Sequence, residues 1–289
     1  MKKLLITGIS GFLGQYFARH KMDWEVHGTY YSTPTQAAGL SLHQVDLTNT
    51  KEHSELLNRV QPDAILHLAA LSNPNVCEQK PELSYAINQE VGLAFAKYAA
   101  TKHIPYLFTS TDLVFQGDDA PYAPADMPAP IMTYGKDKYH AEKAILQQYS
   151  EATIARLPLL YGLGANFLSN WIQKLKNGEK VYAFTDEYRT PTYAPDAAAG
   201  LLLLLEQKQT GIWHLGGKES ISRFDFIRLA AKVFALDESL MVPSLQKEVK
   251  MPAARPANVS LDSSATYEIG FSPKSMEENL QLIHSTKRH

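Results

Sequence analysis

The segment that most constrains this chain lies at its start, where a short apolar run, Lys3 to Thr7, leads directly into three glycines. Gly8, Gly11 and Gly14 form the pattern G-x-x-G-x-x-G. A residue without a Cβ lets the backbone turn tightly and approach a pyrophosphate closely. The N–H groups of a helix that begins near Phe12 would then point at that anion. The segment predicts the first βα unit of a dinucleotide-binding sheet, although a glycine triplet alone also suits a tight strand-to-helix turn.

Apolar runs and helix-like segments alternate along much of the chain. Strands that alternate with helices imply a parallel sheet covered on both faces, and strands that are almost wholly apolar agree with burial on both sides. The sequence therefore predicts an α/β fold, a Rossmann-type doubly wound parallel sheet with a smaller C-terminal substrate-binding lobe. Further strands are expected at Glu25–Tyr30, His43–Asp46, Asp63–Ala69, Ile104–Thr109 and Thr153–Leu157, and helices at Phe12–Lys21, Pro81–Lys102, Thr133–Tyr149 and Pro195–Glu206.

The regular alternation loosens after Tyr161, and this change suggests how the chain is organised. Residues 1–160 are expected to form the dinucleotide-binding domain. Residues 161–194 and 217–289 are expected to form the substrate-binding lobe. The segment 195–216 is expected to return to the sheet of the first domain.

Charge and cysteine content narrow the classes of partner. The formal net charge is −2, which gives no reason to expect a nucleic-acid or membrane partner. The single cysteine, Cys77, rules out an internal disulfide framework and fits a reducing, cytoplasmic compartment. The apolar run Leu4 to Ile6 is too short for a signal peptide, and Leu201 to Leu205 is too short to span a bilayer. A cytoplasmic monomer or homodimer is expected.

The pattern Y-x-x-x-K occurs three times, so its position must decide which copy carries chemistry. Tyr98 is interpreted as a packing residue, and Tyr139 is rotated away from Tyr134 on the same helix. Tyr134 begins its helix after a loop with four prolines and follows the strand end Thr109–Asp112. Ligands of open parallel sheets bind beyond the carboxyl ends of the strands. The three pairs are Tyr98/Lys102, Tyr134/Lys138 and Tyr139/Lys143.

The chemistry of the second pair depends on its spacing. Residues four apart share a helix face, so the Lys138 ammonium can lie near the Tyr134 phenol. A free phenol has a pKa of about 10, and a nearby cation together with an oxidised nicotinamide lowers that pKa. The phenol can then donate a proton to a developing alkoxide. The Thr111 hydroxyl can hydrogen-bond the same oxygen.

The end of the second strand bears on the choice of cofactor. NAD-selective sheets place a carboxylate there to bind the ribose 2′-hydroxyl, whereas here the end reads HGTYYST. No arginine lies there either, and Arg19 on the first helix is a candidate substitute. NADP(H) is therefore favoured, with NAD(H) as the alternative.

The histidines and the cysteine suggest no metal site. Neither H-x-x-x-H nor C-x-x-C occurs in the chain. His67 lies within an apolar strand and is interpreted as a core histidine whose ring nitrogens are hydrogen-bonded.

These segments together give the chain its family resemblance. It resembles the extended short-chain dehydrogenase/reductase superfamily and, more narrowly, the dTDP-4-dehydrorhamnose reductase family. The matching pieces appear in the family's order and span nearly the whole chain. They are TGISGFLG (Thr7–Gly14), VDLT (Val45–Thr48), HLAA (His67–Ala70), TSTDLVF (Thr109–Phe115), YGKDK (Tyr134–Lys138), RTPTYAPDAA (Arg189–Ala198) and RPANVSLD (Arg255–Asp262).

The resemblance implies a role for each matching position. Thr111, Tyr134 and Lys138 are implied to be catalytic. Asp112, Arg189 and Arg255, together with Thr111, are expected on the substrate side, where an arginine fork suits a diphosphate; the alternative for both arginines is a surface ion pair. Contacts to the cofactor are expected from Gly8, Ser10, Gly11, Phe12, Leu13, Gly14, Tyr30, Asp46, Leu47, Leu68, Ala69, Ala70, Tyr134 and Lys138.

One departure from the family bears on the reaction. Leu113 follows Asp112, where the family often has tyrosine and sugar dehydratases tend to have an acidic pair. The missing glutamate favours keto reduction over dehydration. Some family members are magnesium-linked dimers, but their acidic residues are not found here, so no metal is assigned. We expect NAD(P)H-dependent reduction of a 4-keto nucleotide sugar, with a nucleotide-sugar epimerase or a non-catalytic, cofactor-binding regulatory subunit as alternatives.

Overall fold

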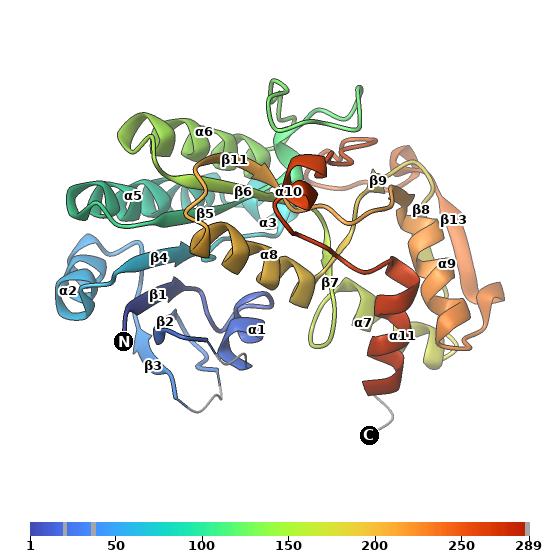
Figure 1. Cartoon of the computed structure of the whole chain (residues 1–289). Coiled ribbons are helices and arrows are strands. Elements are labelled where there is room, and N and C mark those ends of the chain that lie inside the picture. The colour runs from blue at the N-terminus through green and yellow to red at the C-terminus, as the bar shows by residue number, and fades with distance from the viewer. Residues whose placement is uncertain (20–21, 36–38, 287–289) are drawn as a thin grey trace.

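The computed structural model describes residues 1–19, 22–35 and 39–286 (Figure 1). One seven-stranded sheet runs in the order β11-β6-β5-β4-β1-β2-β3, and every neighbouring pair is parallel. The expected α/β, doubly wound fold is confirmed. The strands of this sheet are β1 (Lys3–Thr7), β2 (Glu25–Tyr30), β3 (Ser41–Gln44), β4 (Ala64–His67), β5 (Tyr106–Thr111), β6 (Thr153–Leu157) and β11 (Gly211–His214).

Helices cover both faces of the sheet. Successive strand residues point to opposite faces: Leu4 packs in a cluster with Phe17 of α1 and Leu201 of α8, whereas Leu5 packs with Phe95 of α5. Burial on both sides explains why the strands read as apolar runs. The helices of the first face are α1 (Gly14–Arg19) and α8 (Ala194–Glu206), and those of the second are α2 (Thr50–Val60), α5 (Val91–Lys102) and α6 (Thr133–Gln148).

Several strand ends differ from the expected ones because the pairing partner decides where a strand stops. β3 ends at Gln44, the partner of Tyr30 at the end of β2, and not at Asp46. β4 ends at His67, the partner of Thr7, and not at Ala69. β5 starts later and continues to Thr111, which pairs with Leu157 of β6. β2 and β6 have the expected bounds.

The helices of the first half differ most from expectation at α1, at residues 81–102 and at α2, whereas α6 and α8 each differ from the expected bounds by one residue. α1 begins at Gly14 instead of Phe12, because a turn closed by the Gly11 N–H to the Gly8 carbonyl comes first; its expected end at Lys21 lies outside the described residues. The stretch expected as one helix is α4 (Pro81–Tyr85), the π-helical turn η1 (Ala86–Glu90) and α5. α2 was not predicted, although Asn49, whose side chain caps its N-terminus, is a start signal.

Most C-terminal elements, among them α7, α9, α11, β8 and β13, lie beside the sheet at the right of Figure 1, whereas α8 and α10 pack against the sheet and β11 is one of its strands. They have their own core, in which Phe226 of α9 and Ile172 of α7 are buried. The division into a domain and a lobe stays a prediction. The remaining elements are α3 (Pro74–Gln79), η2 (Asp112–Val114), β7 (Leu160–Tyr161), α7 (Phe167–Lys176), β8 (Val181–Phe184), β9 (Tyr188–Arg189), β10 (Thr192–Tyr193), β12 (Ile221–Ser222), α9 (Arg223–Val233), η3 (Glu238–Leu240), β13 (Met241–Ser244), η4 (Gln246–Glu248), α10 (Ser264–Glu268) and α11 (Met276–Thr286).

The proline-rich segment before α6 is irregular, as expected, with a single bridge from Tyr122 to Leu261. The Tyr122 hydroxyl accepts hydrogen bonds from the backbone N–H groups of residues 117–119 and so ties the loop to itself. Within the described ranges, none of the helices combines the length and apolar character that crossing a bilayer requires.

Candidate active site

A single cavity of about 940 Å³ collects the residues that the sequence assigned to a site. It opens at the carboxyl ends of the strands and reaches the C-terminal elements. Every residue expected to contact cofactor or substrate, from Gly8 in the glycine loop to Arg255, lines it. The roles of these residues stay predictions, but the fold brings all of them to one place.

Two of the three glycines are required by close packing. Gly8 has a left-handed φ of +68°, and a Cβ there would lie 2.9 Å from the Ala69 Cα. A Cβ on Gly14 would lie 2.5 Å from the Ile9 carbonyl oxygen. Gly11 differs, because its Cβ would have only the Gly8 carbonyl oxygen nearby, at 3.1 Å. Packing therefore leaves no room for a side chain at Gly8 or Gly14, whereas Gly11 faces the cavity.

Two threonines fix the loop to its neighbours. The Thr7 Oγ1 accepts hydrogen bonds from the N–H groups of Leu68 and Ala69, both at 3.1 Å. The Thr29 Oγ1 accepts one from the Gly8 N–H at 3.1 Å. Thr29 also lines the cavity and was missed by the sequence reasoning, although it belongs to the inspected end of the second strand.

The end of the cavity beyond β2 and β3 carries no positive charge in the described part of the chain. Tyr30, Asp46 and Leu47 line it, and the Asp46 Oδ1 accepts hydrogen bonds from the N–H and hydroxyl of Thr48. Arg19 is exposed on α1 and does not line the cavity. The suggestion that Arg19 clamps a 2′-phosphate is therefore not supported by its position.

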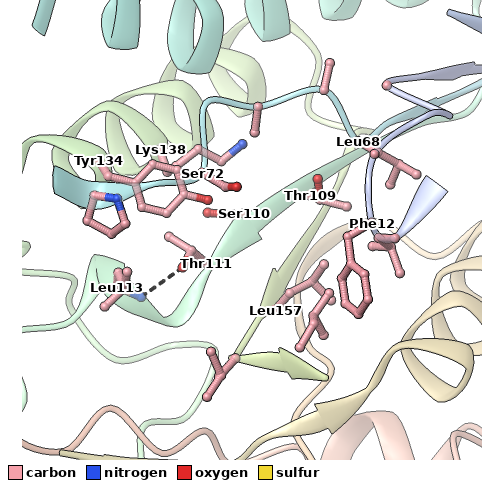
Figure 2. Close-up of a pocket in the computed structure, with 18 of the residues that line it drawn as sticks. Phe12, Leu68, Ser72, Thr109, Ser110, Thr111, Leu113, Tyr134, Lys138 and Leu157 are labelled. Atoms are coloured by element: carbon pink, nitrogen blue, oxygen red, sulfur yellow. Dashed lines mark hydrogen bonds between the residues drawn. The ribbon is translucent and has the colours of Figure 1, made fainter. Parts of the chain in front are cut away.

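Tyr134 and Lys138 project from the start of α6 toward the end of β5, where Ser110 and Thr111 lie (Figure 2). Burial raises the pKa of Tyr134, which is 8% exposed, well above its usual value, and Cys77 and Asp112 add to this, while the neighbouring Thr111 hydroxyl acts to lower it. Burial also lowers the pKa of Lys138, which is 1% exposed, to about 7, although Glu142 acts to raise it. Both shifts follow from the cost of holding a charge away from water.

The Lys138 ammonium has no hydrogen-bond partner among the described residues, and its Nζ lies 3.8 Å from the centroid of the Phe108 ring. A buried ammonium without an acceptor is destabilising. Because Lys138 lines the cavity, a ligand that brings hydroxyl groups would satisfy it. With the open face at Gly11, these residues fit a nicotinamide dinucleotide.

The other two tyrosines have structural contacts. The Tyr98 hydroxyl donates to the Leu57 carbonyl at 3.3 Å, and the Tyr139 hydroxyl approaches the Met127 sulfur at 3.9 Å. Neither residue lines the cavity. Of the three Y-x-x-x-K copies, Tyr134 and Lys138 alone face it.

A buried polar network supports this part of the site and was missed from sequence. Glu142, one turn beyond Lys138 on α6, accepts hydrogen bonds from Ser110 and from Arg156, whose Nη2 lies at 2.8 Å. Arg156 also contacts the His214 Nε2 at 3.4 Å. The spacing of Glu142, four residues after Lys138, is a signal that could have found it.

His67 corrects one prediction. It is fully buried, as expected, but neither ring nitrogen has a hydrogen-bond partner among the described residues, so it is not the satisfied histidine the sequence suggested. Its ring lies 5.5 Å from the rings of Phe95 and Phe108. Burial, and secondarily Lys138, lower its pKa to about 3. His67 therefore acts as a neutral aromatic packing residue.

The far end of the cavity is rich in charge. The Arg189 Nη1 donates to both carboxylate oxygens of Asp112 at 2.8 Å, and its Nη2 to Glu187 at 3.3 Å. Arg189 is thus in a buried ion pair and not in the surface pair considered as an alternative, whereas Arg255 has no carboxylate partner among the described residues. Glu187 and Arg223 also line the cavity and were missed.

A family model described as "RmlD substrate binding domain" matches residues 1–288. The chain belongs to this family. The resemblance to the dTDP-4-dehydrorhamnose reductases and the extended dehydrogenase/reductase superfamily is confirmed.

Similar proteins include reductases and a subunit of a different enzyme. The chain is 32% identical to the probable low-salt glycan biosynthesis reductase Agl14 of Haloferax volcanii, over 97% of this chain and 96% of that protein. It is 30% identical to the methionine adenosyltransferase 2 subunit beta of Rattus norvegicus, over 93% of this chain and 83% of that protein. The chain is therefore similar in sequence both to a reductase and to a protein named as a subunit of another enzyme.

A solved structure of the same family is closely similar. The dTDP-4-dehydrorhamnose reductase of Bacillus anthracis, in complex with NADP, superposes with a TM-score of 0.86 at 26% identity and covers 99% of this chain and 100% of its own. The agreement extends over the sheet and the C-terminal elements alike.

Proposed function

We propose that this protein reduces a 4-keto nucleotide sugar with NADPH and that Tyr134 is the proton donor. One observation carries the proposal: the buried Lys138 ammonium has no hydrogen-bond partner among the described residues, and it lies one turn from Tyr134 in the cavity that the glycine loop also lines. Membership in the RmlD family and the similarity to named reductases support it.

The chemistry divides between the bound groups and the chain. The nicotinamide supplies the hydride when it is bound. Lys138 holds ribose hydroxyl groups and adds a positive charge beside the phenol. Thr111 positions the substrate oxygen, and Tyr134 donates its proton to that oxygen as negative charge develops. Because burial raises its pKa, Tyr134 stays protonated at neutral pH, as a proton donor must.

NADP(H) is proposed over NAD(H). The residues that line the cavity at the end of β2 are Thr29, Tyr30 and Tyr31, so this strand end brings no carboxylate to repel a 2′-phosphate or to bind a 2′-hydroxyl. The Asp46 carboxylate beyond β3 is hydrogen-bonded to Thr48. The similar reductase of Bacillus anthracis is named as a complex with NADP. NAD(H) stays the alternative.

Reduction is favoured over elimination by the surroundings of Asp112. Its carboxylate is held by Arg189, and Leu113 occupies the next position, so the chain has no acidic pair at this point. An epimerase stays an alternative within the same superfamily. A non-catalytic subunit is the second candidate function, because of the 30% identity to methionine adenosyltransferase 2 subunit beta.

One assay separates these functions. The purified protein is mixed with NADPH and dTDP-4-dehydrorhamnose, with no other protein present, and NADPH absorbance is followed. Steady oxidation over many turnovers is expected of a reductase. Tight NADPH binding without oxidation would favour the regulatory subunit. Conversion between sugar epimers without net NADPH consumption would favour the epimerase.

A further inference from the structure

Five charged side chains gather where the C-terminal elements border the cavity. They are Asp112, Glu187, Arg189, Arg223 and Arg255. They lie close enough that the pKa of Arg223 responds to all four of the others. Three arginines and two carboxylates leave one positive charge in excess, so the cluster as a whole favours an anion.

Arg189 is already neutralised within the chain. It is 5% exposed and donates to both oxygens of Asp112 and to Glu187. The Arg189 Nε has no hydrogen-bond partner among the described residues, but this atom is buried. An anion would therefore have to reach the Nη groups, where it would compete with two buried carboxylates, and displacing either would leave that carboxylate without its partner. Arg189 is therefore poorly suited to anchor a ligand and well suited to hold Asp112 beside Thr111.

Arg223 presents the opposite situation. Its guanidinium has no hydrogen-bond or ion-pair partner among the residues that the structure describes, and it is only partly buried at the wall of the cavity. Two aromatic rings pack against it, with the guanidinium carbon 4.4 Å from the Phe167 centroid and 4.8 Å from the Trp171 centroid. These rings hold the flat group in one orientation while leaving its N–H groups free.

The backbone fixes where Arg223 starts. Its N–H donates to the Glu187 carbonyl at 2.9 Å, and Ile221 pairs with Arg189 in the β9–β12 ladder. Arg223 is also the first residue of α9, where the helix dipole disfavours a cation. Helix stability therefore does not account for an arginine at this position, whereas a bound anion would.

Arg255 keeps its charge as well. Its N–H groups donate to the carbonyls of Ala253 and Ala254 and to the Asn75 Oδ1, all of them neutral acceptors. Burial lowers the pKa of Arg223 to about 10, with Glu187 acting to raise it, so both arginines are charged at neutral pH.

We propose that Arg223, with Arg255 beside it, binds the diphosphate of the nucleotide sugar, and that Arg189 instead positions Asp112. This inference rests on the proposed substrate class. It replaces the expectation that Arg189 serves as an anchor and adds a residue that the sequence did not single out. A planar fork that binds two phosphate oxygens at once suits a diphosphate better than a single ammonium does.

The test is binding of dTDP, measured by isothermal titration calorimetry, with NADPH titrated in parallel. Arg223→Met keeps an unbranched stem between the two rings and removes the charge. It should weaken dTDP binding by about 10- to 100-fold, the range for losing charge-assisted hydrogen bonds. NADPH affinity should not change.

Arg228→Met is the matched control. Arg228 lies on the same helix, is exposed, and pairs with Asp225 at 2.8 Å. It should bind dTDP like the wild type. Arg223→Lys keeps the positive charge but loses the fork, so its affinity should fall between those of the wild type and Arg223→Met. Thermal melts and NADPH binding show whether each variant is folded.

Wild-type affinity for dTDP in both Arg223 variants, when folded, would overturn the inference. That result is distinct from failure of the proposed function. If the wild type reduces the keto sugar and Arg223→Met does so with an unchanged KM, the inference fails and the reductase stands. If dTDP binding depends on Arg223 but no keto sugar is reduced, the inference stands and the reductase fails.

Discussion

Tyr134 and Lys138 lie one helical turn apart on α6, and burial moves their pKa values in opposite directions. The pKa of Tyr134 is raised and that of Lys138 is lowered to about 7. The phenol therefore keeps its proton at neutral pH, whereas the ammonium is poised to lose one. A ligand whose hydroxyl groups accept hydrogen bonds from Lys138 would favour its charged form and raise its pKa. Cofactor binding would in this way place a positive charge beside the Tyr134 phenol.

Removing the phenol hydroxyl tests the assignment of the acid. Tyr134→Phe should fold normally and lose about 10²–10⁴-fold in kcat, because general acid catalysis acts as alkoxide charge develops. Tyr98→Phe and Tyr139→Phe make the same chemical change next to their own lysines and should retain wild-type turnover. Steady-state rates at saturating NADPH decide the assignment, and near-wild-type turnover in Tyr134→Phe would remove it.

Replacing Lys138 should raise the stability of the protein while removing its activity. The Lys138 pKa is about 7 in the folded protein and 10.5 as the ordinary value. Between these limits the unfolded chain holds a proton that the folded chain has lost, so the free energy of unfolding rises with pH. Lys138→Met has no ionisable group at this position and so lacks this contribution to the pH dependence of the free energy of unfolding. Its Tm should exceed that of the wild type most at or below about pH 7, and the gap should narrow toward about pH 10.

Melting curves of both proteins across this pH range provide the measurement. Lys136→Met is the control, because Lys136 is exposed on the same helix. A pH-independent Tm difference between the wild type and Lys138→Met would contradict the lowered pKa. Lys138→Met should also lose NADPH turnover, since it removes the group expected to hold the ribose.

The glycines should respond differently to a side chain. Gly11→Val brings its Cβ to 3.1 Å from the Gly8 carbonyl oxygen and otherwise faces the cavity, so the protein should still fold but lose NADPH binding. Gly14→Val should instead destabilise the fold, because its Cβ would meet the Ile9 carbonyl oxygen at 2.5 Å. Fluorescence titration and thermal melts distinguish the two effects. Unchanged NADPH affinity in Gly11→Val would exclude the loop as the pyrophosphate site.

The end of β2 predicts cofactor preference. Because Thr29, Tyr30 and Tyr31 line the cavity without a carboxylate, kcat/KM should be higher with NADPH than with NADH. Tyr30→Asp introduces the missing acid and should shift the ratio toward NADH, by repulsion of the 2′-phosphate. A clear NADH preference in the wild type would show that another group selects the cofactor.

Local sequence patterns were enough to predict most strands of the sheet and the helix α6 that carries Tyr134 and Lys138. The alternation of apolar runs with helix-like segments indicates strands buried on both faces, and the glycine pattern indicates a turn in which the backbone packs closely. These patterns located β1, β2, β6 and the start of α6 directly. The four-residue spacing of Tyr134 and Lys138 reports a shared helix face. These features depend on neighbours along the chain, and for that reason they are visible in it.

Pairing between distant residues was decided by the tertiary structure alone. Strand ends such as Gln44 depend on the partner strand. The ring nitrogens of His67 have no hydrogen-bond partner in the part of the chain that the structure describes, and this depends on what packs around β4. Arg189 and Arg223 look alike as letters, yet the fold gives one two carboxylates and the other none among the described residues. The sequence by itself determined which residues share an element and a face. The ion pair between Asp112 and Arg189, which are 77 positions apart, was decided by the tertiary structure, because the two charges form a pair only when folding removes both of them from water together.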